Sequence, residues 1–133
     1  MVELLIAMGV FVLATSTITF LIIDAYIANR AGRERTMATF LAEEGIEASR
    51  SIRDNNWGNL AAGEHGLAIS GGNWIFSGTQ DDISNQLKEG SRKITVENID
   101  SKRKKITSQV TWKLTEARSQ AVNLITYLTN WGL

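Results

Sequence analysis

The residue with the clearest potential chemistry in this sequence is a carboxylate, Glu3, at the start of an apolar run. From Leu4 to Ile23 the chain contains no charged residue, and the next charge is Asp24. An ionised carboxylate at membrane depth is costly unless a cation pairs with it. We therefore expect Glu3 either to have a positively charged partner or, as the alternative, to lie among lipid headgroups at the end of a span.

The other polar residues do not combine into a catalytic or metal site. His65 is the only histidine and there is no cysteine, so neither a catalytic triad nor a zinc site can be assembled. Asp81 and Asp82 with Asn85 offer oxygen ligands for calcium, but the ligand spacing of a calcium loop is missing and a turn explains them. We predict no catalytic residue, no metal and no cofactor, and hence no enzyme activity.

Two groups of basic residues are candidates for surface contacts. The first group is Arg30, Arg33 and Arg35; the second is Lys102, Arg103, Lys104 and Lys105. Phosphate binding requires clustered Lys and Arg, so nucleic acid is one alternative partner. The chain has 14 basic and 14 acidic residues, however, and the second group falls in an expected hairpin turn, where it can instead protect a sheet edge or meet acidic residues of another subunit. Nucleic acid therefore ranks as the lesser alternative.

One long helix is expected to carry Glu3 and the first basic group. At about 1.5 Å per residue, residues 4–23 span the roughly 30 Å hydrocarbon layer of a membrane. Helical periodicity then continues, and no proline interrupts it. The continuing apolar stripe comprises Met37, Leu41, Ala48 and Ile52, with Phe40 and Gly45 beside it. We predict a transmembrane or filament-core helix over 1–23 and an amphipathic continuation over 24–54, ending at Asp54-Asn55-Asn56.

The rest of the chain predicts a small β-rich head. Residues 55–90 are glycine-rich and form a connecting αβ-type loop with one short strand at Trp74–Phe76. Within 91–133, residues alternate between apolar and polar over 93–97, 106–112 and 121–128, with turns near 100–102 and 115–117. Because the sheet's apolar face needs a cover, we expect an α+β fold in which the C-terminal half of the helix packs against a small antiparallel β-meander.

The charge distribution around the apolar span raises a question of topology. No basic residue precedes Leu4 and no small-residue cleavage site follows Ile23, which disfavours a cleaved secretory signal. The first basic group follows the span and, by the positive-inside rule, would place the head of a simple anchored protein in the cytoplasm.

Several stretches resemble one protein family. Met1-Val2-Glu3 followed by Leu4 to Phe11, with the long helix and C-terminal sheet, resembles the type IV pilins and pseudopilins. Their mature chains begin with a methylated phenylalanine, then threonine or serine, two aliphatic residues and glutamate, so the resemblance implies two further residues before Met1. A weaker similarity to predicted pilins of small-genome candidate-phylum bacteria covers 43–48, 51–57 and 127–131.

The resemblance implies a pilin fold and the role of structural subunit, as a major pilin, in a helical type IV pilus-like surface filament. The implied partners are copies of the same chain, the cytoplasmic membrane that holds unassembled subunits, a prepilin peptidase and the pilus assembly machinery. A basic leader removed by that peptidase would resolve the topology question. Glu3 would pair with the N-terminal amine of a neighbouring subunit. The implied assembly residues are Glu3, Leu4, Leu5, Ile6, Met8, Gly9 and Phe11.

The sequence departs from the family pattern in two ways, since it has neither the proline of the membrane half nor the C-terminal cysteine pair. Without proline, local helix melting would fall on Gly9, Thr15, Ser16, Thr17 and Thr19; alternatively, these hydroxyls bond back to the preceding turn. We assign the rings of Trp57, Trp74, Trp112, Phe76 and Tyr127 to the core rather than to adhesion or charge conduction. The role of Trp131 is left open, although Trp131 and Tyr127 are candidates to hold the C-terminal tail against the head by packing.

Two alternatives to a major pilin remain open at this stage. One is a minor pilin or pseudopilin that serves secretion or DNA uptake. The other, from a different class, is a single-pass membrane protein whose small head binds a ligand or a partner. The filament reading requires a paired Glu3, whereas the anchored protein requires an organised pocket.

Overall fold

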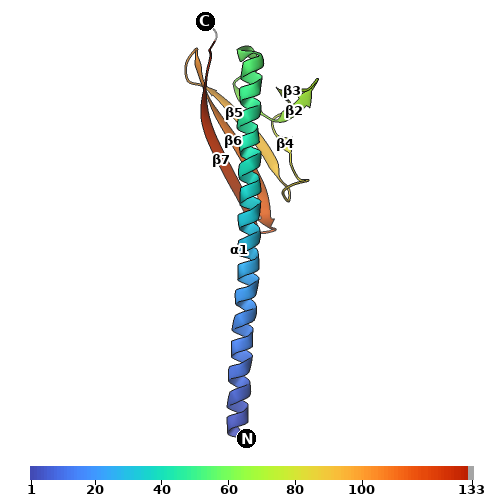
Figure 1. Ribbon diagram of the computed structural model, residues 1–133, viewed down its shortest axis with the longest axis vertical. Coiled ribbons are helices and arrows are strands. Elements are labelled where there is room, and N and C mark those ends of the chain that lie inside the picture. Colours follow the sequence, from blue (N-terminus) through green and yellow to red (C-terminus); the bar gives the residue numbers. More distant parts are fainter. Residues whose placement is uncertain (132–133) are drawn as a thin grey trace. The chain divides into compact units, whose positions relative to one another are not determined.

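The computed structural model describes residues 1–131 and shows an α+β chain in which one long helix precedes antiparallel sheets (Figure 1). Helix α1 covers Val2–Asn55. The elements that follow are η1 (Trp57–Asn59), β1 (Gly63–His65), β2 (Leu67–Ser70), β3 (Asn73–Phe76), β4 (Asp81–Asp82), β5 (Ser91–Asn98), β6 (Arg103–Thr115) and β7 (Arg118–Thr129). The chain divides into two compact units, Met1–Arg33 and a second that begins at Glu34.

Helix α1 ends at the polar stretch where the sequence predicted its stop. The amide of Asn56 still donates to the carbonyl of Ile52, at 3.1 Å, but Asn56 itself is extended. Its side chain accepts a hydrogen bond from the Gly58 amide at 2.8 Å and so caps the short helix η1. Asparagine favours such local side-chain to backbone bonds over a continued helix, which explains the boundary.

The main sheet of the second unit is an antiparallel meander. Its strand order is β1-β5-β6-β7, and β4 also pairs with β5. Ile94 lies opposite Ser108 and Val110 lies opposite Val122, so alternate residues share one face. The buried apolar residues of that face are Ile94, Val96, Ile106, Val110, Trp112, Leu114, Val122 and Leu128.

The covered face of α1 in this unit is rich in small residues. Ala38, Ala42, Ala48 and Ser49 are fully buried, and Gly45 is buried among them. Small side chains let the helix axis approach the sheet closely, while Leu41, Ile46 and Ile52 fill the flanking space. The meander β5–β7 consequently lies along this part of α1 (Figure 1).

Burial differs from the sequence prediction at Met37 of the helix and at Tyr127 of the last strand. Met37, expected in the covered stripe, is 42 % exposed, and Phe40 is 62 % exposed, because the small residues define a face turned away from both. Tyr127 is also exposed, since strand alternation sends Leu128 inward and its neighbour outward. The assignment of Tyr127 to the core was therefore wrong. Trp131, which was left open, follows β7 and is exposed as well.

The glycine-rich connection contains more regular structure than the single strand predicted at Trp74–Phe76. Four short strands, β1 to β4, lie between η1 and β5. Strands β2 and β3 form a separate hairpin whose turn is Gly71-Gly72. These glycines have φ of 57° and 80°, the left-handed values that a two-residue hairpin turn requires.

Candidate functional site

The first unit presents a continuous, solvent-exposed apolar surface. The candidate assembly residues Leu4, Leu5, Ile6, Met8 and Phe11 are all between 59 and 69 % exposed. Glu3 is exposed in the first turn of α1, where a carboxylate interacts favourably with the helix dipole. Soluble monomers rarely expose apolar patches of this kind, so this surface requires lipid or protein around it.

Helix α1 is long and apolar enough to cross a membrane, by length and composition. Its apolar part begins one residue after Glu3 and ends at Ile23. A carboxylate at this end of the helix lies near the lipid headgroups or requires a cation as its partner. The first basic side chain in the sequence is Arg30, so no side chain near Glu3 in the first unit can be that cation.

The hydroxyl groups in the apolar helix are satisfied within the helix itself. Thr15, Ser16, Thr17 and Thr19 each donate to a carbonyl four residues earlier, at 2.7 to 2.9 Å. Of the two alternatives given by the sequence, the helix as described therefore shows hydroxyl groups that bond to the preceding turn. A Cβ built on Gly9 would meet nothing within 4 Å, so this glycine leaves room for a close neighbour. Melting of this helix on assembly stays a prediction.

The first basic group lies around the boundary between the units. Arg33 and Arg35 are exposed, and Arg30 is partly exposed. Within the first unit, Arg33 also lines a shallow hollow with Ala25, Tyr26 and Asn29. Tyr26 is 66 % exposed there, so an aromatic ring, an amide and a guanidinium face solvent together.

The second basic group does not form one cationic patch. Arg103 pairs with Asp100 at 2.7 Å and Lys105 with Glu97 at 2.8 Å. The hydrogen bond from Arg103, with that from the Lys102 amide, lowers the pKa of Asp100. The hydrogen bond to Glu97 raises the pKa of Lys105. Arg103 and Lys105 therefore stabilise a turn and a sheet face through ion pairs within the head.

Lys104 differs from its neighbours because strand alternation turns it toward the inner face. Its ammonium donates to the carbonyl of Leu60 and lies 4.9 Å from the ring centroid of Trp57. Burial lowers the pKa of Lys104. This partly buried lysine lies at the end of the core beside η1, and its role as a surface contact stays a prediction.

A buried arginine that the sequence reasoning missed joins three elements. Arg92 on β5 is 4 % exposed, and it donates to Asp81 at 2.9 and 3.1 Å. It also donates to the Leu41 carbonyl at 3.0 Å and to Glu44 at 3.2 Å, both on α1. Asp81 in turn accepts from the Leu67 amide at 3.1 Å. The sequence did carry a signal, because position 92 is two residues before Ile94 and four before Val96 and so lies on the same inward face of the strand.

The residues considered for calcium have other partners. Asp81 is committed to Arg92, and Asp82 accepts from the Ser84 amide at 2.8 Å. Hydrogen bonding to Ser84 lowers the pKa of Asp82. The ring of His65 stacks on Phe76, with centroids 4.3 Å apart, and its Nε2 lies 2.9 Å from the Ala61 carbonyl oxygen. Over residues 1–131, no three His, Cys, Asp or Glu residues gather closely enough to hold a metal ion.

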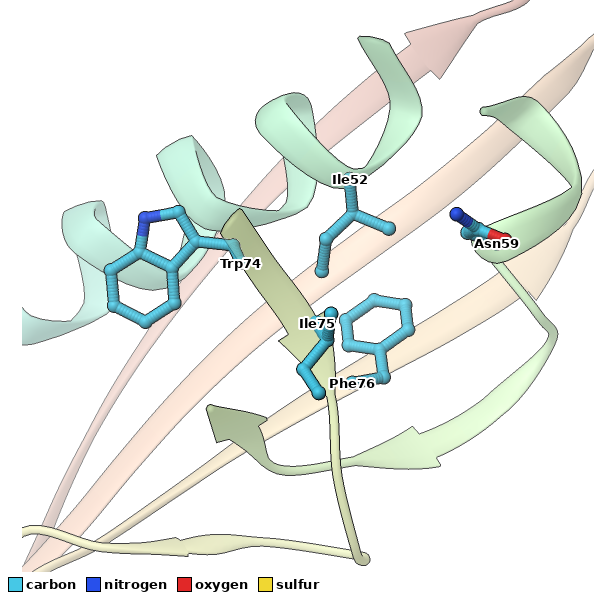
Figure 2. Close-up of a pocket in the computed structure, with 5 residues that line it drawn as sticks. All are labelled: Ile52, Asn59, Trp74, Ile75 and Phe76. Atoms are coloured by element: carbon cyan, nitrogen blue, oxygen red, sulfur yellow. The ribbon is translucent and has the colours of Figure 1, made fainter. Parts of the chain in front are cut away.

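One hollow of about 270 Å³ lies beside the hairpin β2–β3, and Figure 2 shows its lining. Ile52 comes from α1, Asn59 from η1, and Trp74, Ile75 and Phe76 from β3. Four of its five lining residues are apolar in type, and Asn59 supplies the one amide side chain among them. A ligand site usually combines an apolar wall with several convergent polar groups, which this hollow lacks.

Comparison of the chain with protein-family models, with curated proteins and with solved structures finds no match in any of the three.

Proposed function

We propose that this chain is the structural subunit, as a major pilin, of a helical type IV pilus-like filament on the cell surface. The observation that carries the proposal is the exposed apolar surface of residues 4–23, headed by Glu3 and continued by a sheet-covered half of the same helix. Packing this surface against copies of itself would remove it from water, and it would supply the main cohesion of a filament.

In this proposal Glu3 pairs with the N-terminal amine of a neighbouring subunit. A lone carboxylate in an apolar filament core is strongly unfavourable, whereas a paired one is tolerated and fixes the register of the incoming subunit. Because the donor and acceptor surfaces differ, the contact is heterologous and repeats without closing, as a filament requires. The proposed fold is the pilin fold, and the proposed partners are a prepilin peptidase, the assembly machinery and the membrane that holds the unassembled pool.

Electron microscopy of sheared surface filaments, combined with mass spectrometry of the same preparation, tests the proposal. We expect the chain to repeat along the filament with residues 4–23 at its centre. The variant Glu3→Gln should lose filaments, because removing one partner of a buried pair costs about 3–5 kcal/mol. Glu97→Gln is the matched control, since Glu97 is exposed and pairs with Lys105. Filaments from Glu3→Gln at the wild-type level, or a chain found as a membrane monomer, would refute the proposal.

The second candidate is a single-pass membrane protein with a binding head. The apolar helix fits it equally, and the hollow lined by Ile52, Asn59 and the β3 residues is where a small apolar ligand would bind. A membrane-bound monomer whose Trp74 fluorescence responds to such a ligand would favour this candidate.

A further inference from the structure

Helix α1 carries two exposed surfaces of complementary chemistry. The first, here the Tyr26 surface, consists of Tyr26, Asn29 and Arg33 and belongs to the first unit. The second, here the Phe40 surface, consists of Phe40, Glu43 and Glu47 and belongs to the second unit. In each, residues recur three and four positions apart, so they share one helix face.

The Phe40 surface has the composition of a contact rather than of a solvated face. Phe40 is 62 % exposed although this unit has a core that buries other large apolar residues. Two carboxylates, Glu43 and Glu47, follow it on the helix. Large aromatic anchors surrounded by charged residues are typical centres of protein interfaces. Glu47 pairs with Arg50 one turn on, but an exposed pair of this kind is weak and is easily exchanged for another.

The Tyr26 surface offers the matching groups in the same order. Tyr26 and Phe40 are aromatic, Asn29 can donate to Glu43, and Arg33 is opposite in charge to Glu47. Each of these pairs is separated by the same 14 positions in the sequence. Because the separation is the same for all three pairs, one axial displacement of two parallel helices brings all three to the same height.

We propose that the Tyr26 surface of one copy packs against the Phe40 surface of a second copy in parallel orientation, with an axial displacement of about 21 Å. The occupant is a second copy of this chain because charge, aromatic pairing and spacing all match at one register. The inference rests on the proposed filament function and adds to it a contact between copies outside the apolar core. Glu3 lies only two residues from the N-terminus, so its pairing with a neighbour's N-terminal amine needs a much smaller axial displacement than about 21 Å. The contact proposed here would therefore join a different pair of copies from the pair joined through Glu3.

Cysteine cross-linking tests this register directly, because the chain contains no cysteine. Full-length Tyr26→Cys and Phe40→Cys chains with different tags are mixed in detergent, associated by detergent dilution and oxidised. A disulfide requires Cα atoms less than about 7 Å apart. Tyr26→Cys with Asp54→Cys is the control, because Asp54 is also exposed but would lie about 21 Å further along the partner helix than Phe40. We expect at least about tenfold more cross-linked heterodimer for the 26–40 pair than for the control.

Charge reversal tests the pairing of Arg33 with Glu47. Arg33→Glu in the first chain, or Glu47→Arg in the second, should each lower the 26–40 cross-link about tenfold, and the two together should restore it. Equal cross-linking of the 26–40 and 26–54 pairs overturns the proposal. A second result also overturns it. If Arg33→Glu lowers the 26–40 cross-link and Glu47→Arg in the other chain does not restore it, the partner of Arg33 is a lipid phosphate instead of Glu47.

The cross-link and the filament are read separately. Microscopy of the same preparation, with and without Glu3→Gln, reports whether filaments form, whereas gels report the 26–40 disulfide. A specific disulfide without filaments keeps this contact and refutes the filament. Filaments without the specific disulfide keep the filament and refute this contact.

Discussion

The tight contact of Gly45 on α1 with the sheet gives the sharpest prediction for stability. A Cβ added to Gly45 would lie 2.4 Å from Ser108 Oγ, 2.8 Å from Ile94 Cδ1 and 3.3 Å from Ser108 Cβ. Gly45, Ser108 and Ile94 are all buried, so these side chains must shift within a packed core, or the backbone must move, to admit a methyl group. Gly45→Ala should therefore destabilise the second unit although alanine is the better helix former.

The expected magnitude follows from two opposing terms. Overpacking of a rigid core costs up to about 3 kcal/mol. The higher helix propensity of alanine returns about 1 kcal/mol. The net loss for Gly45→Ala is thus about 2 kcal/mol, which with a typical urea dependence lowers the urea midpoint by about 1–2 M.

Ser108 provides a second variant with the opposite sign. Its hydroxyl is buried and has no hydrogen-bond partner among residues 1–131. Replacing an unsatisfied buried hydroxyl removes a desolvation penalty, so Ser108→Ala should stabilise by about 1 kcal/mol. Because Ser108→Ala also removes the nearest clash, Gly45→Ala should cost at least about 1 kcal/mol less in that background.

Urea unfolding of the full chain in non-ionic detergent, followed by tryptophan fluorescence, measures these changes. All four tryptophans lie after residue 34, so the signal reports the second unit. Gly32→Ala is the control, because a Cβ there meets nothing within 4 Å and the midpoint should not fall. Unchanged stability of Gly45→Ala, or identical costs with and without Ser108→Ala, would refute the reasoning.

Three further predictions concern polar contacts of the second unit and use the same unfolding assay. Arg92→Leu leaves the mostly buried Asp81 without its cation, so it should lower the free energy of unfolding by about 3 kcal/mol. The double variant Arg92→Leu with Asp81→Leu should lose less than the sum of the two single losses. Additive losses would contradict the pairing. Lys104→Met keeps the apolar stem but leaves the Leu60 carbonyl without its donor, so we expect a loss of about 1 kcal/mol, and none for Lys102→Met. Because the pKa of Asp100 is lowered in the folded state, its contribution is present above the ordinary value of 3.8 and is lost as the pH falls through the lower folded value. Asp100→Asn should thus weaken the fall in stability between about pH 4 and pH 2, and an unchanged pH profile would argue against it.

The sequence predicts most of the architecture because local patterns control it. A charge-free run of membrane length, continued helical periodicity and the absence of proline specify one long helix, and the stretch after Asp54 stops it. Alternation over 93–97, 106–112 and 121–128 falls within the observed strands β5 to β7. The candidate assembly surface follows from the same information, since an apolar helix with no apolar partner in the chain must be exposed.

Only the tertiary structure decides which polar residues are buried and which apolar ones are not. The partners of Arg92 come from positions 41, 44 and 81, so no local pattern brings them together. Lys104 and Lys105 are neighbours in sequence and strand alternation sends them to opposite faces, but only the folded chain places Leu60 beside one and Glu97 of β5 beside the other. Phe40 is left in solvent because the small residues around Gly45 fit the sheet more closely than a bulky stripe would. Long-range packing makes these choices, since each depends on the shape of a surface built from segments far apart in the chain.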